Sequence, residues 1–123
     1  MASEGFHEAA DLLTKHTRDL HRAIVSLMEE LEAIDWYQQR VDVAGDDALK
    51  AILAHNRDEE KEHAAMVLEW IRRQDATFDR YLREYLFTDR PITALEAAAE
   101  TGNGADGAVA PEPRSAIGSL RRS

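Results

Sequence analysis

Residues 58–70 read Asp58-Glu59-Glu60-Lys61-Glu62-His63-Ala64-Ala65-Met66-Val67-Leu68-Glu69-Trp70, and this stretch decides the fold. It contains Glu60-x-x-His63. Residues three apart lie on one face of an α-helix, so the carboxylate and the imidazole can hold one transition-metal ion. At about 100° per residue, Leu53 and Val67 fall within about 20° of Glu60, which places that carboxylate in an apolar stripe. Burying a carboxylate there costs several kcal/mol unless it is paired or binds a metal. The stretch therefore predicts a helix with a paired or metal-binding carboxylate on its apolar face.

The composition limits the possible partners. The chain has 123 residues, enough for one small domain, and its formal net charge is −9. Nucleic-acid binding is not expected, because phosphate contacts need a basic patch, whereas an acidic surface attracts cations. The absence of cysteine excludes disulfides and thiolate metal sites.

The sequence also indicates where in the cell the protein is located. No run of 18 apolar residues is present, so we expect no membrane-spanning segment. The N-terminus has neither a basic start nor an apolar run, which does not fit a signal peptide. The sequence therefore predicts a cytoplasmic protein.

Two long helices are predicted around a short break. Apolar residues spaced mostly by threes and fours predict one helix from about Glu8 to Val41, roughly 50 Å long; they are Leu13, Leu20, Ile24, Leu27, Leu31 and Ile34. Gly45 suits its C-cap, and Asp46 or Asp47 suits the N-cap of a second helix ending near Gln74. A tight turn makes these helices an antiparallel hairpin.

The hairpin brings distant carboxylates to one level. Glu30 lies 15 residues before Gly45 and Glu60 lies 15 residues after it. Residues equidistant from the turn come level in such a hairpin, so Glu30 and Glu60 are expected at the same height. Tyr37 is expected about two turns away.

Shorter segments follow the hairpin. The sequence predicts a helix over residues 76–87 capped by Asp75, a break at 88–91, and a short helix over 92–100 that ends at Gly102. Residues 1–100 are thus expected to form the helical domain. Gly, Ala and Pro dominate residues 101–114, which predicts a flexible linker, and residues 115–123 form a tail carrying Ile117 and Leu120 that can dock on a partner.

One hairpin supplies only half a metal site. Glu30, Glu60 and His63 are fewer ligands than ferrous iron commonly takes. Two copies related by a twofold axis would form a four-helix bundle and contribute two Glu and two Glu-x-x-His, the ligand set of ferritin-like di-iron proteins. The predicted fold is therefore all-α: an antiparallel two-helix hairpin (half a ferritin) plus short C-terminal helices, with the bundle completed by dimerisation.

At this point the chain resembles the encapsulated ferritins. The matching stretches are Met28–Tyr37, Ile52–Met66, Tyr85–Thr88 and Pro91–Thr93. The resemblance implies a ferroxidase that oxidises Fe(II) with dioxygen at two iron ions shared between two subunits. It also implies an annular decamer built from five dimers, working in the lumen of an encapsulin shell that holds the mineral.

The resemblance also assigns residues. Glu30, Glu60 and His63 match the iron ligands, and Tyr37 matches a tyrosine close to the centre. Glu29 and Glu32, with Trp36 beside them, match a peripheral acidic site interpreted as an uptake route for iron. The tail Ser115-Ala-Ile-Gly-Ser-Leu120 resembles the shell-targeting peptide Leu-Gly-Ile-Gly-Ser-Leu, but Ser115 stands in place of its first Leu and Ala116 in place of a Gly.

Plainer interpretations stay open beside these. The protein can be a metal-dependent assembly module without turnover, or a helical interaction module that binds no metal. Glu29 and Glu32 can form a solvated acidic face, Tyr37 can be an interface aromatic, and the tail can be a terminus without a partner.

Overall fold

The computed structural model describes residues 5–101, and over that range the chain is helical without strands, which confirms the predicted all-α class. A 3-10 turn, η1 (Ala10–Leu12), is followed by the helices α1 (Lys15–Val43), α2 (Asp47–Gln74), α3 (Ala76–Tyr85) and α4 (Ile92–Thr101). These elements form two compact units, which divide after Asp75. None of the described helices is both long enough and apolar enough to cross a membrane.

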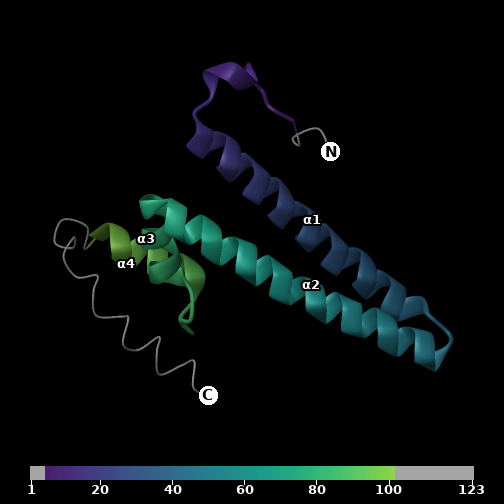
Figure 1. Ribbon diagram of the computed structural model, residues 1–123. Helices are drawn as coiled ribbons and strands as arrows, with labels where there is room; N and C mark the ends of the chain where they lie inside the picture. Colours follow the sequence, from purple (N-terminus) through teal and green to yellow (C-terminus); the bar gives the residue numbers. More distant parts are fainter. Residues whose placement is uncertain (1–4, 102–123) are drawn as a thin grey trace. The chain divides into compact units, whose positions relative to one another are not determined.

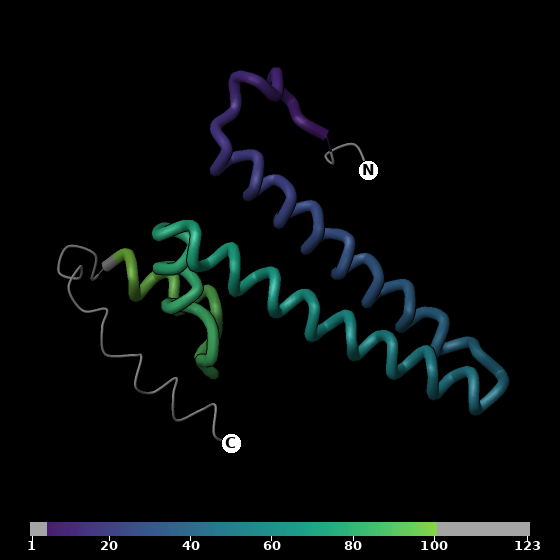
Figure 2. Tube along the Cα trace, viewed as in Figure 1, coloured from purple at the N-terminus to yellow at the C-terminus, as the bar shows by residue number. Residues whose placement is uncertain are grey.

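The first unit is the predicted hairpin. Helices α1 and α2 run in opposite directions side by side, and a short turn joins them (Figures 1 and 2). Asp46 is the N-cap of α2, as predicted: its carboxylate accepts a hydrogen bond from the Leu49 N–H at 2.8 Å. Farther along α2, the Arg57 guanidinium donates a hydrogen bond to the Gln38 side-chain oxygen of α1 at 2.9 Å and links the two helices.

The prediction of Gly45 as the C-cap of α1 is wrong. That position is filled by Ala44, whose N–H donates to the Arg40 carbonyl at 2.9 Å. Ala44 has φ −66° and ψ 131°, and neither described glycine has a positive φ. Because the chain leaves α1 in an extended conformation, the turn does not need the left-handed backbone that favours glycine.

The predicted start of the first helix is also wrong, because α1 begins at Lys15 rather than near Glu8. Thr14 caps it by accepting the Thr17 N–H at 3.0 Å. The Arg18 side chain donates to the Leu13 carbonyl at 2.6 Å and to the Ala10 carbonyl at 3.1 Å. These carbonyl groups therefore have hydrogen-bond donors even though the residues before Thr14 do not continue the α-helix. The 29-residue helix is therefore about 44 Å long rather than about 50 Å.

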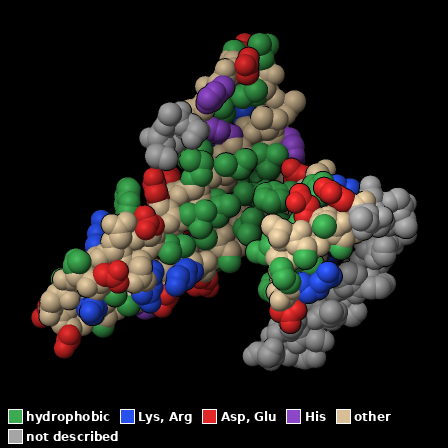
Figure 3. All heavy atoms as spheres, turned by 180° about the vertical axis from the view of Figure 1, so that it is seen from behind, with side chains coloured by type: hydrophobic (Ala, Val, Ile, Leu, Met, Phe, Trp, Pro, Cys, Tyr) green, Lys and Arg blue, Asp and Glu red, His purple; other side chains and the backbone are tan. Residues whose placement is uncertain are grey.

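The hairpin has very little core of its own. Among the described residues only Ala64 and Ile71, both on α2, are buried. Large apolar side chains on both helices are more than a third exposed, and Figure 3 shows hydrophobic groups gathered on the surface; they include Ile24, Leu31, Trp36, Leu49, Ile52, Met66 and Trp70. A folded chain rarely leaves so much apolar surface in water, and such surface is typical of interaction sites.

The second unit contains α3 and α4. Helix α3 ends at Tyr85, two residues earlier than predicted, because Phe87 adopts φ 61°, which no helix accommodates. The Thr88 hydroxyl donates to the Tyr85 carbonyl at 3.0 Å and closes this end. Helix α4 follows Pro91, close to the predicted position. Capping of α3 by Asp75 stays a prediction, and the predicted end at Gly102, the linker after Thr101 and the tail at 115–123 lie outside the described residues.

Candidate metal centre

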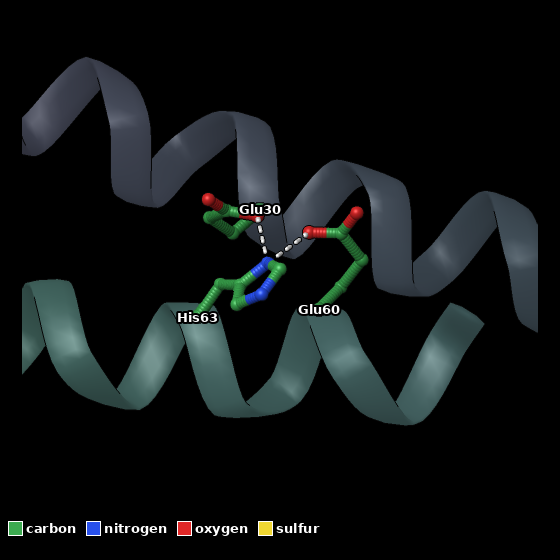
Figure 4. A group of neighbouring side chains, drawn as sticks. All are labelled: Glu30, Glu60 and His63. Carbon is green, nitrogen blue, oxygen red and sulfur yellow. Dashed lines mark hydrogen bonds and ion pairs between the residues drawn. The ribbon is translucent and has the colours of Figure 1, made fainter. Parts of the chain in front are cut away.

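Three side chains from the two long helices converge in the middle of the hairpin. Glu30 comes from α1, and Glu60 and His63 come from successive turns of α2 (Figure 4). One donor atom from each lies within 4.8 Å of the other two, and no other group of three such residues in the described part of the chain comes this close. The antiparallel pairing brings Glu30 level with Glu60, as the distances from the turn require.

The imidazole lies between the two carboxylates. His63 Nδ1 is 3.3 Å from Glu60 Oε1 and 3.9 Å from Glu30 Oε1. The carboxylate side chains are about a quarter exposed, 25% for Glu30 and 24% for Glu60, so solvent reaches the centre. The three donors therefore point into one partly enclosed space that an ion can enter.

The two carboxyl groups have unequal proton affinities. A hydrogen bond with Glu60 raises the pKa of Glu30, and burial and the negative charge of Glu60 raise it further. The same hydrogen bond lowers the pKa of Glu60, and His63 adds to that effect. Glu30 therefore binds a proton more readily than Glu60, and a cation that binds both oxygens competes with protonation.

The donor set fits a transition-metal ion. Two carboxylates and one imidazole offer hard oxygen donors and an intermediate nitrogen donor, a combination used for iron, manganese and zinc. One hairpin supplies three donors, so a six-coordinate ion would keep open positions. These can be filled by water, by dioxygen or by ligands from another chain.

A further carboxylate, which the sequence analysis did not single out, approaches the other side of the imidazole. Glu59 Oε1 lies 4.0 Å from His63 Nε2, and Glu59 Oε2 lies 3.8 Å from His55 Nε2. Glu59 precedes His63 by four residues, and this spacing on a helix is the signal that would have found it. A carboxylate beside the second ring nitrogen helps to fix the ring's orientation.

The other predicted site residues do not join the three donors. Tyr37 is half-buried and lies seven residues beyond Glu30, about 10 Å along the axis of α1; the guanidinium carbon of Arg40 stacks 5.3 Å from its ring centroid. Glu29 is exposed, and its charge also raises the pKa of Glu30. Glu32 is half-buried, and Trp36 is half exposed. Their roles in the reaction and in iron uptake stay predictions.

Comparison with known proteins places this centre in a family. The chain is 61% identical over 109 residues to an encapsulated ferritin-like protein of Rhodospirillum rubrum, an alignment that covers 89% of this chain and 78% of that protein. It is 51% identical over 104 residues to a ferritin-like protein of Thermotoga maritima (85% and 90% covered). It is 38% identical over 112 residues to the encapsulin nanocompartment cargo protein EncC of Myxococcus xanthus (85% and 86% covered).

Comparison with solved structures agrees with the sequence relatives. The crystal structure of protein ne0167 from Nitrosomonas europaea superposes with a TM-score of 0.70 at 65% sequence identity, covering 72% of this chain and 97% of that one. The EncFtn-like family matches residues 5–89, which include both long helices and all three donor residues. The chain therefore belongs to the EncFtn-like family and is an encapsulin-associated ferritin-like protein.

Proposed function

We propose that this protein is a ferroxidase that oxidises Fe(II) to Fe(III) with dioxygen and supplies iron for storage inside an encapsulin nanocompartment. One observation carries the proposal: Glu30, Glu60 and His63 present donor atoms within 4.8 Å of one another on the face of a ferritin-like hairpin. The names of the relatives agree with it, since they include a ferritin-like protein and an encapsulin cargo protein.

The catalytic centre is proposed to lie between two copies. The described part of the chain carries the set of two carboxylates and one imidazole once, and both long helices expose large apolar side chains to solvent. A second hairpin would cover this face and add its own Glu30, Glu60 and His63, giving ligands for two iron ions per dimer. Five such dimers, arranged as an annular decamer, are the proposed assembly.

The residues have different proposed roles. Glu60, whose pKa is lowered, ionises more readily than Glu30, whose pKa is raised, so Glu60 is proposed to be the first oxygen donor to ferrous iron. His63 supplies a nitrogen donor, and carboxylate-rich ligation favours the ferric product. Each ferrous ion loses one electron, and dioxygen accepts it. Tyr37 is proposed to donate a hydrogen bond near the centre, and Glu29 and Glu32 to attract incoming iron.

Residues 115–123 are proposed to dock on the inside of the shell. The supporting observation is the cargo name of the Myxococcus xanthus relative, together with the tail's likeness to a targeting peptide. Deletion of Ser115–Ser123 should abolish co-purification with a shell protein and leave iron oxidation unchanged. Retained loading would show that another segment makes the contact.

The ferroxidase proposal is tested by adding ferrous iron anaerobically, admitting oxygen, and following ferric absorbance together with oxygen uptake. Glu60→Ala and His63→Ala should each oxidise iron far more slowly than the parent. The matched control is Glu62→Ala, because Glu62 is an exposed carboxylate on the same helix that points away from the donors. If either site variant keeps the parental rate, the centre is wrong.

Metal-dependent assembly without turnover is the second candidate, because the same donors on an uncovered apolar face can bind an ion that only joins two chains. Zinc would then serve as well as iron, and no oxygen would be consumed. Size-exclusion runs with Fe(II), Zn(II) and chelator, beside an oxygen electrode, separate the two. A helical interaction module would carry no stoichiometric metal at all.

A further inference from the structure

A hydrogen-bonded bridge joins the two long helices on the turn side of the metal centre. Arg57 of α2 donates from Nη1 to the Gln38 side-chain oxygen of α1 at 2.9 Å. Each end is also held within its own helix: Arg57 Nε donates to Asp58 Oδ1 at 3.0 Å, and Gln38 Nε2 donates to Asp42 Oδ1 at 2.9 Å. Although Gln38 is exposed, the Arg57 side chain is only 19% exposed. The guanidinium is therefore oriented by two partners and is largely covered by the hairpin.

The bridge lies close to the donors on both helices. Arg57 is three residues before Glu60 on α2. Gln38 is eight residues after Glu30, which is about 12 Å along α1. At about 100° per residue, Arg57 and His63 lie on opposite sides of Glu60, each about 60° away. The bridge thus flanks the donor face and leaves the side of the imidazole open.

The spacing of the helices at the donors needs such a contact. The turn holds one end of the hairpin, but Glu60 lies 14 residues beyond Asp46. That separation is about 21 Å, so a change of about 5° in the angle between the helices would move the donors of α2 by about 2 Å. Metal donors must be held to within about 0.5 Å of their working positions. A contact closer to the centre than the turn is therefore required.

Apolar packing fixes this spacing only weakly on the turn side. The two buried residues of the described chain, Ala64 and Ile71, both follow Glu60 and lie on the side of the centre away from the turn. Polar contacts between helices are a known means of fixing register where apolar packing alone does not. The Arg57–Gln38 bridge supplies such a contact between the turn and the donors.

We propose that Arg57, through its hydrogen bond to Gln38, is a positioning residue for the metal centre. It fixes α2 against α1, so that the donors of the two helices meet at the spacing that an ion requires. The inference deepens the proposed function and rests on its metal site. Arg57 acts through the placement of α2 and not as a ligand.

The charge of Arg57 distinguishes positioning from a simple electrostatic effect. A cation beside a metal site repels the incoming ion, so removal of the guanidinium charge alone should tighten metal binding. Loss of positioning should weaken metal binding instead. Gln38 carries no charge, so its replacement by leucine tests the bridge without any change in charge.

Titration of the full chain with Co(II), at equal chain concentrations, measures the effect. Gln38→Leu should bind Co(II) about threefold to tenfold more weakly than the parent, the range expected when one hydrogen bond is lost. The visible absorption spectrum of the bound ion should change as well, because it reports the coordination geometry. The matched control is Gln39→Leu, since the Gln39 amide donates to Asp35 of its own helix at 3.2 Å. The control should bind like the parent, and circular dichroism verifies that both variants remain helical.

Changes at Arg57 and a conservative change at Gln38 test the same contact. Arg57→Met keeps the apolar stem and should weaken Co(II) binding, although the lost charge alone would tighten it. Combining Gln38→Leu with Arg57→Met should weaken binding no further than Arg57→Met does, because both changes remove one contact. Gln38→Glu keeps an oxygen acceptor for the guanidinium and should retain or improve the parental affinity.

Parental Co(II) affinity in a helical Gln38→Leu chain, or tighter binding by Arg57→Met, would overturn the proposal. Additive losses in the double variant would overturn it too. Oxygen uptake with Fe(II) separates these results from the ferroxidase proposal. If the parent binds Co(II) but takes up no oxygen with Fe(II), the ferroxidase fails and the positioning result stands. If the parent oxidises iron while Gln38→Leu keeps the parental Co(II) affinity, only the positioning role is wrong.

Discussion

Replacing Glu30 by glutamine should make the metal-free protein more stable and the metal-loaded protein less stable. The donor oxygens of Glu30 and Glu60 lie within 4.8 Å of each other. Two negative charges at that distance repel by about 1 kcal/mol in water and by about 3.5 kcal/mol at an effective dielectric constant of about 20. Solvent reaches a quarter of each side chain, so the lower figure applies.

The hydrogen bond with Glu60, burial and the negative charge of Glu60 raise the pKa of Glu30, so ionisation of Glu30 costs free energy in the folded chain. In Glu30→Gln, an amide can donate a similar hydrogen bond to Glu60 without any charge. Without metal, the variant should therefore be more stable than the parent by about 1 kcal/mol, which raises the melting temperature by about 4 °C or more for a domain of this size.

Bound metal should reverse the order of stability, so that the parent becomes more stable than Glu30→Gln. At a free metal concentration of about 100 times the dissociation constant, binding stabilises the parent by about 2.7 kcal/mol, and the variant should lose most of this gain because a neutral amide is a poor ligand. Thermal unfolding in EDTA and in Co(II), with Glu62→Gln as the matched exposed control, measures both effects. If Glu30→Gln melts below the parent in EDTA, or gains as much from Co(II), the account of Glu30 as a destabilising carboxylate that binds metal is wrong.

Three further outcomes follow from the same contacts. Metal affinity should fall as pH is lowered through the raised pKa of Glu30, because the cation must displace that proton, and calorimetry in buffers of different ionisation enthalpy should detect its release; equal affinity across that range would contradict it. Arg72 and Arg73 lower the pKa of Glu69 from 4.5 to about 2, so this ion pair stabilises the helix end above pH 4.5 and is lost as pH falls toward 2. Glu69→Gln should therefore unfold more easily in urea at pH 7 by about 0.5 kcal/mol, a modest effect since Glu69 is solvent-accessible, and should match the parent near pH 2. Asp46→Ala should cost about 1 kcal/mol in the same assay through loss of the α2 cap, and Asp47→Ala should cost less.

The sequence predicts the hairpin well because its signals are local and regular. Apolar spacing and the Asp46 cap give α2 its observed bounds, and rigid helical geometry then brings Glu30, Glu60 and His63 together from their distances to the turn. The errors lie where several local structures have similar free energies. Thr14 competes with an earlier helix start, and Phe87 takes a left-handed conformation that no residue type announces.

Side-chain contacts outside the regular pattern are harder to predict. The approach of Glu59 to His63 depends on rotamers, which spacing allows but does not fix. The hollow lined by Ala23 and Ser26 of α1 and by Met66, Val67 and Trp70 of α2 draws on residues far apart in the sequence, so it becomes visible only when both helices are placed.

The scarcity of buried residues has a consequence for the life of the protein in the cell. Ala64 and Ile71 alone are buried in the described part of one chain, so in the proposed dimer much of the hydrophobic stabilisation would come from contacts between chains. Stability then depends on the concentration of chains, and the melting temperature should rise with it. In the proposed dimer, a copy without its partner would spend more time unfolded, and proteases clear chains in that state. If the proposed centre is shared between two chains, a single copy would hold only half of its ligands and would not oxidise iron outside the assembly.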